Sequence, residues 1–216
     1  MAFRVLISSV IGYVLGTIPS ASIASRLAGG DRRVDEQGSG NPGGANAINV
    51  LGKKWGVGVT LADIIKAFIA ARVGNRLAGS VGANVAATAA VAGHSYPLGR
   101  RGGKGVAASI GQVAGTMPAY IPLDAALAGI GTRIPVAHRA RAGTALASLG
   151  WISIATLWWR RGWPNPGGPE VSWALPAGAI VSSAIIAERF ESEAHRVTEF
   201  RQGDNEVGDG ESEPTS

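Results

Sequence analysis

Long apolar segments separated by short polar ones make up most of the chain, and this pattern predicts helices that cross a membrane. Residues 5–25 carry no charged side chain over 21 positions, which is enough to cross a hydrocarbon core of about 30 Å. The further apolar segments are residues 57–73, 77–92, 106–117, 119–134, 144–159 and 173–187. We therefore predict an all-α, polytopic membrane fold with about seven transmembrane helices.

The stretch from residue 106 to residue 134 decides whether the number of spans is odd or even. It is too long for one ordinary span, and Pro118 and Pro122 lie near its middle. Proline removes a backbone donor and interrupts helical hydrogen bonding. We interpret the stretch as two short spans joined at these prolines.

The distribution of positive charge favours the same count. With the N-terminus outside and seven spans, 14 lysine and arginine side chains fall on the cytoplasmic side and five fall outside. Cytoplasmic loops carry such an excess in membrane proteins. A single span over 106–134 would move the C-terminal tail outside and give a worse balance. The pattern predicts a multi-pass protein of the cell membrane with both of its glycine-rich loops in the cytoplasm.

Composition fits this class of protein. Of the 216 residues, 46% are hydrophobic and only 16% are charged, whereas soluble domains average about 25% charged residues. The 32 glycines suit tightly packed membrane helices, which meet through small residues. The chain has no cysteine, so disulfides and thiolate chemistry are excluded, and its three separated histidines argue against a metal site.

Charge is divided unevenly between the two ends of the chain. Residues 1–187 carry 17 basic and 6 acidic side chains, a net charge of +11, whereas residues 188–216 carry 3 basic and 9 acidic side chains, a net charge of −6. A basic membrane body suits anionic lipid headgroups or phosphorylated substrates. No nucleic-acid-binding fold accompanies the charge, so we predict no nucleic-acid partner. We expect one domain over 1–202 and an acidic, disordered tail over 203–216.

Two glycine-rich segments are the candidate binding sites. Residues 93–105 hold five glycines and three positive side chains between two apolar segments, and residues 38–46 form a second such segment. Glycines allow the backbone to expose successive N–H groups, which form a concave anion site, and a nearby lysine or arginine adds full charge. This pattern predicts phosphate binding. An ordinary basic loop that only sets membrane orientation is the alternative.

Asp63 and Lys66 interrupt the second apolar segment. They lie three residues apart, on one face of a helix, and charged residues within a membrane face the bundle interior and pair with one another. We predict a satisfied ion pair, with a role in shaping the site as the alternative.

Several motifs, in order and spacing over about residues 8–150, resemble the PlsY-type glycerol-3-phosphate acyltransferases. They are Gly-Ser-Gly-Asn-Pro-Gly-Gly-Ala-Asn at 38–46, Leu-Gly-Lys-Lys at 51–54, Asp-Ile-Ile-Lys at 63–66, Gly-His-Ser-Tyr-Pro at 93–97 and Gly-Gly-Lys-Gly-Val-Ala at 102–107. The resemblance implies an integral membrane enzyme of phospholipid biosynthesis that works among membrane lipids. Such an enzyme transfers an acyl chain from acyl phosphate to the 1-hydroxyl of glycerol 3-phosphate, giving lysophosphatidic acid, without a metal or another cofactor.

Carried onto this sequence, the resemblance implies a set of site residues. The catalytic candidates are His94, Lys104 and Ser39. The substrate-binding candidates are Asn41, Asn46, Lys53, Arg101, Gly102, Gly103 and Gly105. Among these, Lys53 and Arg101 are hypotheses from proximity in sequence alone, as replacements for a charge that the family carries and this chain lacks.

The chain departs from the family pattern at several places, of which two bear most directly on the site. The family has Thr-Asn and then an arginine three residues later, whereas this chain has Ala45, Asn46 and Asn49. A His-x-x-Asn motif after the last helix is also absent; Arg189 and Ser192, or Glu193 and Arg196, stand in its place. Two alternatives to the enzyme therefore stay open. One is a catalytically inactive relative that binds phosphorylated lipids or a membrane partner, and the other is a small-solute transporter.

Overall fold

The structure is a computed structural model that describes residues 1–136 and 138–209, and all regular elements in that part are helical. The elements in chain order are α1 (Ala2–Gly16), α2 (Ser20–Ala28), α3 (Gly44–Leu51), α4 (Lys53–Ser95), α5 (Val106–Thr116), the 3₁₀ helix η1 (Pro118–Tyr120), α6 (Ile121–Gly131), α7 (Arg139–Arg161) and α8 (Ala174–Asp209). The predicted all-α class is confirmed for this part of the chain.

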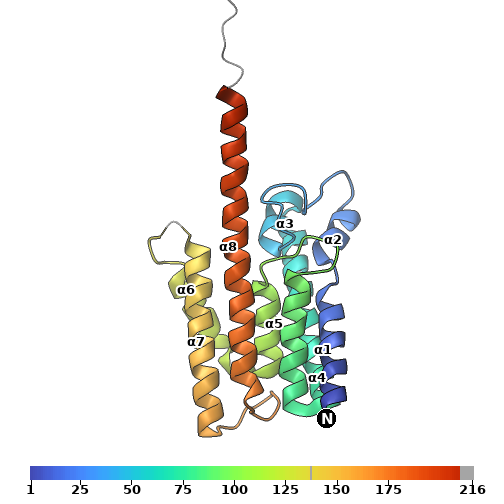
Figure 1. Ribbon diagram of the computed structural model, residues 1–216, viewed down its shortest axis with the longest axis vertical. Helices are drawn as coiled ribbons and strands as arrows, with labels where there is room; N and C mark the ends of the chain where they lie inside the picture. The colour runs from blue at the N-terminus through green and yellow to red at the C-terminus, as the bar shows by residue number, and fades with distance from the viewer. Residues whose placement is uncertain (137, 210–216) are drawn as a thin grey trace, which may run out of the picture.

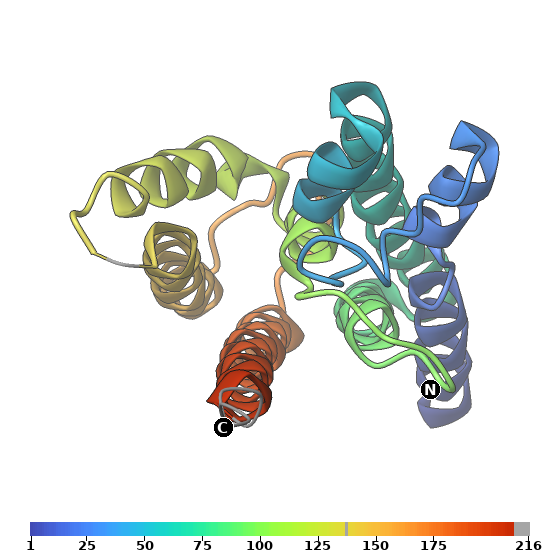
Figure 2. The same cartoon turned by 90° about the horizontal axis from the view of Figure 1, so that it is seen from above.

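The long helices stand side by side, and the glycine-rich segments gather at one end of the bundle. Figure 1 shows α2, α3 and the connection from α4 to α5 at the end opposite the N-terminus. Seen from above, α6 and α7 form a pair on one side of the molecule, and α1 and α2 lie on the other (Figure 2). The helix α4 packs against α1, α3, α5 and α8, so it is the centre of the arrangement.

The helix α4 is a tight hairpin of two arms, residues 53–77 and 80–95. Helical geometry is lost at Ala78 and Gly79, and Gly79 has a φ of 60°, which favours glycine. The arms pack so closely that a Cβ atom on Gly74 would overlap the carbonyl oxygen of Gly82. The hairpin agrees with the predicted separation of segments 57–73 and 77–92, and it brings distant residues of the two arms together.

Backbone contact between small residues joins α1 to the second arm of α4. A Cβ atom on Gly12 would overlap the carbonyl oxygen of Ala86, and one on Gly16 would overlap that of Ala90. Lipid tails are as apolar as these side chains, so moving the side chains out of lipid into a helix contact gains little free energy. Helices in a membrane therefore associate through close van der Waals packing. The high glycine content of the sequence therefore has a direct structural use.

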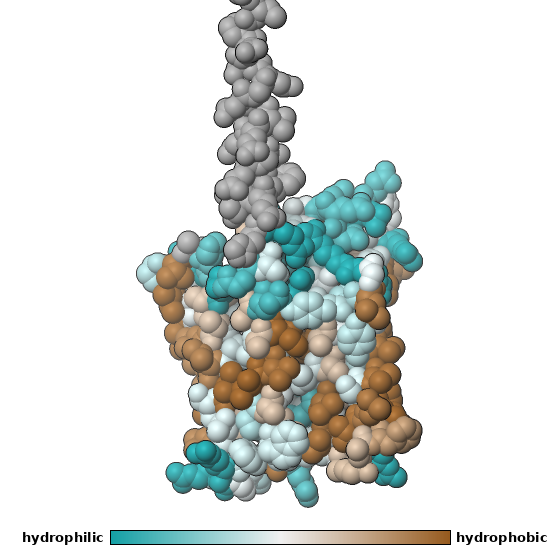
Figure 3. Space-filling view, in the orientation of Figure 1, coloured by the Kyte–Doolittle hydropathy of each residue, from teal (hydrophilic) through white to brown (hydrophobic). Residues whose placement is uncertain are grey.

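The outer face of α1 is apolar. Leu6, Val10 and Val14 recur every four residues and are 60%, 55% and 58% exposed, whereas the buried face carries Ser8, Gly12 and Gly16. Figure 3 shows a band of apolar side chains between two hydrophilic ends of the molecule. Large apolar side chains outside and small residues inside are the arrangement expected in a bilayer.

The first apolar segment is a candidate membrane span, as predicted, but its helix is interrupted. Residues 5–25 are not one helix, because α1 ends at Gly16 and α2 begins after Pro19, which lacks an N–H group. By length and hydropathy alone, one stretch of the described residues, Ala2–Ala28, qualifies as a membrane span. The polar stretch that follows contains a short helix, since α3 begins directly after Gly43.

The predicted break in residues 106–134 is confirmed. The helix α5 ends at Thr116, η1 begins at Pro118, and α6 carries Pro122 in its first turn. Each of the two α-helices has 11 residues. That is a length of about 16 Å, which is short for a complete crossing.

The last helix runs past the boundary expected for the domain. The helix α8 continues to Asp209 and projects beyond the rest of the bundle (Figure 1). Residues 203–209 of the expected tail therefore belong to α8, whereas residues 210–216 lie outside the described part of the chain.

Replacing Gly12 with alanine tests the contact between α1 and α4. The added methyl group has to push against the backbone of Ala86, so we expect a loss of about 1–3 kcal/mol in stability. Thermal unfolding of the detergent-purified protein measures this. Gly58→Ala is the matched control, because nothing lies within 4 Å of its added Cβ atom. Equal melting temperatures for the two variants would contradict the described packing.

Candidate active site

The two glycine-rich segments meet at one cavity of about 320 Å³. Ser39, Asn41 and the first turn of α3 line it from one side, and His94, Lys104 and the first turn of α5 line it from the other. Residues of α7 and α8, including Thr144 and Phe190, complete the wall. The two segments are thus neighbours at the same end of the bundle.

A second cavity of about 230 Å³ lies against the first. It is lined by residues 16–22, by Lys66 and by the loop that carries Arg100 and Arg101. Asp63 and His94 line both cavities, so they form part of the wall between them. The two cavities therefore share a wall that carries a carboxylate and an imidazole.

The predicted ion pair between Asp63 and Lys66 is confirmed and is buried. Lys66 Nζ lies 2.9 Å from Asp63 Oδ1, and the two residues are 5% and 1% exposed. Lys66 Nζ also donates to the carbonyl oxygen of Ile18 at 3.2 Å and lies 2.9 Å from Nδ1 of His94. Asp63 Oδ1 accepts a further bond from Ser20 Oγ at 2.9 Å. These contacts join the pair to His94 and to the chain after α1, beside the two cavities.

Both members of the ion pair contact His94. Nδ1 of His94 lies 2.9 Å from Lys66 Nζ and 3.4 Å from Asp63 Oδ1, so it accepts from the ammonium group in one tautomer and donates to the carboxylate in the other. The Nε2 atom faces Gly103, where an added Cβ atom would overlap it. Gly103 in turn donates its backbone N–H to the carbonyl oxygen of His94 at 3.0 Å. That N–H is therefore engaged within the protein, contrary to the expectation that it helps to cradle an anion.

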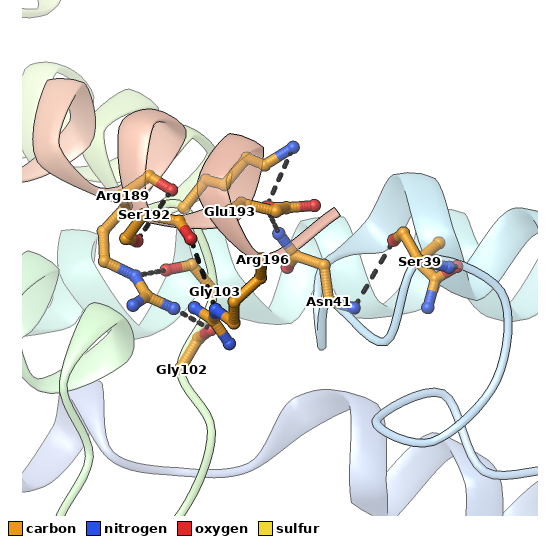
Figure 4. A network of polar contacts seen from close by, with 10 residues as sticks. Ser39, Asn41, Gly102, Gly103, Arg189, Ser192, Glu193 and Arg196 are labelled. Carbon is orange, nitrogen blue, oxygen red and sulfur yellow. Dashed lines mark hydrogen bonds and ion pairs between the residues drawn. The ribbon is translucent and has the colours of Figure 1, made fainter. Parts of the chain in front are cut away.

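Lys104 is held between the two motifs by a carboxylate from α8. Its Nζ lies 3.1 Å from Glu193 Oε2 and 4.8 Å from the centre of the Phe190 ring. The same oxygen of Glu193 accepts a hydrogen bond from Asn41 Nδ2 at 2.7 Å. Figure 4 shows Glu193 reaching Asn41 from α8. One carboxylate thus bridges both predicted phosphate-binding segments.

Arg189, one turn earlier on α8, holds the second glycine-rich segment. Its guanidinium donates to the carbonyl oxygens of Gly102 at 2.8 Å and Gly103 at 3.2 Å (Figure 4). It also lies over the ring of Tyr96, whose hydroxyl donates to the carboxylate of Glu188. Partial burial and this neighbouring carboxylate raise the pKa of Tyr96 to about 12. The Tyr96 hydroxyl therefore stays protonated and remains a donor at physiological pH.

Asn46 and Ser39 have different positions in the site. Asn46 Oδ1 accepts from the backbone N–H of Ser39, and its Nδ2 donates to the carbonyl oxygens of Val34 and Gln37. The predicted substrate-binding amide of Asn46 is therefore occupied in holding the loop. The hydroxyl of Ser39 accepts only a long bond, 3.4 Å, from the N–H of Asn41, and Ser39 lines the larger cavity.

The remaining candidates are divided between the two cavities and the surface. Gly105, with a φ of 84°, precedes α5 and lines the larger cavity, and Gly103 lines the smaller one. Gly102 is buried against the carbonyl oxygen of Ser95. Arg101 lines the smaller cavity and contacts Gly40 of the first motif. Lys53 is exposed at the start of α4 and lines neither cavity, so the structure does not bring it into the site.

Sequence reasoning missed how strongly α8 contributes. Arg189 and Glu193 were noted as residues at the positions of an absent motif, but nothing local in the sequence indicates their contacts with Gly102 and Lys104. Thr144 and Phe190 had no signal at all. When a helix lies far from the motifs in sequence, its contribution to the site can be predicted only once the packing of that helix is known.

These features define an all-helical bundle with two adjoining cavities at one end, lined by both charged and apolar side chains. A sequence model of the family described as glycerol-3-phosphate acyltransferase matches residues 6–199. The chain belongs to the glycerol-3-phosphate acyltransferase family, as the motifs predicted.

Individual relatives agree with this assignment. The chain is 34% identical to the glycerol-3-phosphate acyltransferase of Thermoanaerobacter pseudethanolicus over 158 residues, which is 71% of this chain and 77% of the relative. The enzyme of the same name from Symbiobacterium thermophilum is 38% identical over 151 residues, 69% of this chain and 68% of the relative.

The fold also matches solved structures of PlsY (YgiH), an integral membrane glycerol 3-phosphate acyltransferase. Its glycerol 3-phosphate form superposes with a TM-score of 0.71 at 28% identity, over 91% of this chain and 93% of that one. Its lysophosphatidic acid form gives a TM-score of 0.70. The likeness supports a membrane location for this protein.

Replacing Asp63 alone tests the buried ion pair. Asp63→Ala leaves the Lys66 ammonium buried without its counter-charge, and we expect a loss of about 3–5 kcal/mol in stability. The double variant Asp63→Leu/Lys66→Met removes both charges and should recover most of that loss. Thermal unfolding in detergent compares the three proteins. A double variant no more stable than Asp63→Ala would show that the charges are not coupled.

Proposed function

We propose that the protein transfers an acyl chain from acyl phosphate to the 1-hydroxyl of glycerol 3-phosphate and releases lysophosphatidic acid and phosphate. The observation that carries this proposal is the wall of the larger cavity, where the first turns of α3 and α5 meet beside Lys104. Membership of the glycerol-3-phosphate acyltransferase family supports it. The donor is inferred from the motifs of the second glycine-rich segment.

Two helix N-termini and an ammonium group suit phosphorylated substrates. The first turn of a helix has unpaired N–H groups and a partial positive charge, and both favour a bound phosphate. Acyl phosphate and glycerol 3-phosphate each carry a phosphate group, which accounts for two such termini at one cavity. Phosphate leaves readily once its charge is compensated, so positioning and anion stabilisation supply most of the catalysis.

His94 acts as a hydrogen-bond donor in this proposal. In the tautomer in which Nδ1 accepts from Lys66, Nε2 carries the hydrogen, and this N–H can stabilise negative charge that develops on the reacting acyl or phosphate oxygen. Asp63 and Lys66 are positioning residues, because they act through His94. Ser39 and Asn41 lie at the opposite wall, where they can orient the glycerol phosphate.

The apolar part of the larger cavity suits the acyl donor. Val106, Ala107 and Ile110 of α5 face Ala140 of α7 and Phe190 of α8 across it. An acyl chain can extend past these side chains toward the bilayer while its phosphate reaches Lys104. The water-soluble glycerol 3-phosphate would then approach from the hydrophilic end.

The proposal includes the topology. The seven passes would be α1, the two arms of α4, α5, α6, α7 and α8, with the N-terminus outside the cell and the site at the cytoplasmic face of the cell membrane. The reversal of the chain at the kink of α4 and the break at the prolines near residue 118 support this count, in which α5 and α6 are two short passes.

One observation favours the alternative of an inactive relative. Glu193 already neutralises Lys104, so a phosphate that binds there has to compete with a built-in carboxylate. A protein with this contact can bind phosphorylated lipids weakly without turnover. Direct assay separates the two possibilities.

Lys104→Ala tests the enzymatic proposal. Purified protein receives acyl phosphate and labelled glycerol 3-phosphate, and labelled lysophosphatidic acid is measured. We expect product from the unaltered protein and a drop of roughly 10²-fold in the variant, the scale for loss of one anion-stabilising group. Arg76→Ala removes an exposed positive charge from α4 beside the kink and should keep full activity. Folded, unaltered protein that makes no product would support the inactive relative.

Glu193→Gln tests the competition at Lys104. The amide keeps an oxygen for Asn41 but removes the negative charge, so the KM for the phosphorylated substrate bound at Lys104 should fall severalfold. Glu191→Gln is the control, because Glu191 lies on the same helix as Glu193 but pairs with Arg141 of α7, and its replacement changes the charge equally. A KM that falls to the same extent in both variants would indicate a general charge effect instead.

A further inference from the structure

A third cavity, of about 580 Å³, opens at the same hydrophilic end between α2 and the loop that follows α4. Its charged lining residues are Arg26, Arg32, Arg33, Arg100, Asp31 and Asp35. Four guanidinium groups against two carboxylates leave an excess of two positive charges. The cavity is separate from Lys104, although it shares Pro19, Ser22, Asp35 and Arg100 with the 230 Å³ cavity.

Two of the four arginines are already engaged. Arg33 pairs with Asp35 at 3.5 Å and with Glu36 at 2.9 Å, and Arg100 donates to the carbonyl oxygen of Thr17 at 3.1 Å. Arg26 and Arg32 make no ion pair or side-chain hydrogen bond with any residue that the structure describes. Guanidinium groups bind phosphate oxygens through paired N–H donors, so these two are the available anion ligands.

The helix beside this cavity is amphipathic. Ala21, Ala24 and Ser25 of α2 are buried against the protein, whereas Ile23 and Leu27 are 43% and 70% exposed. Ile23 also lines the cavity. An apolar face next to arginines, at the hydrophilic end of a membrane protein, is the pattern of a helix that lies at the lipid–water interface.

We infer that this cavity binds the headgroup of an anionic phospholipid. The phosphate would lie between Arg26 and Arg32, and the acyl chains would run along Ile23 and Leu27. Free phosphate and glycerol 3-phosphate offer the same anion, but neither uses the exposed apolar side chains, and those side chains favour a lipid. The inference depends on the membrane location and does not depend on the proposed acyl transfer.

Lipid binding to the purified protein tests this inference without any substrate turnover. The protein is purified in a neutral detergent, and native mass spectrometry measures retention of added phosphatidylglycerol and of phosphatidylcholine. We expect the unaltered protein to retain phosphatidylglycerol preferentially. The double variant Arg26→Ala/Arg32→Ala should lose roughly tenfold or more in apparent affinity, since each basic residue near the surface contributes to the attraction of anionic lipid.

The matched control is Arg160→Ala/Arg161→Ala, which removes two exposed arginines at the end of α7. It should bind phosphatidylglycerol as the unaltered protein does, and equal losses in the two double variants would overturn the inference in favour of diffuse charge. Equal retention of the two lipids by the unaltered protein would overturn it without any variant. Displacement of the lipid by glycerol 3-phosphate would instead identify a site for the free phosphate.

Discussion

The buried ammonium group of Lys66 holds together the three segments on which the site depends. It contacts the carbonyl oxygen of Ile18 after α1, the carboxylate of Asp63 on the first arm of α4, and the imidazole of His94 on the second arm. Burying a charge is costly unless it is paired and hydrogen-bonded, and here the ammonium group has a carboxylate, a carbonyl oxygen and an imidazole nitrogen within 3.2 Å. The geometry of the site is therefore fixed by a requirement of electrostatics and not by loop conformation alone.

Close backbone packing makes that contact possible. Glycine at positions 74 and 82 lets the two arms of α4 approach, and glycine at position 12 lets α1 lie against the second arm. The missing side chain of Gly103 leaves room for the imidazole ring of His94 to pack against the backbone at that position. The glycines at these contacts thus determine how closely the helices approach, and with that the distances between the charged side chains.

Local patterns in the sequence were enough to predict most of the fold. Hydrophobic runs located the long helices, prolines located the break after α5, and the spacing of Asp63 and Lys66 predicted their pairing. The two glycine-rich segments, both predicted to bind phosphate, line one cavity. By contrast, α3 was missed because its glycine-rich start reads as loop. The contacts of Arg189 and Glu193 join residues some 90 to 150 positions apart, and no local rule reports such distances.

Arg189 and Glu193 are four residues apart on one continuous helix, so they share a face. Arg189 donates to the backbone of the glycine-rich segment 93–105, and Glu193 bridges Asn41 and Lys104. Because both residues lie on one helix, a rotation of α8 about its axis would displace both contacts together. Whatever binds the projecting end of α8 could thereby alter both glycine-rich segments at once.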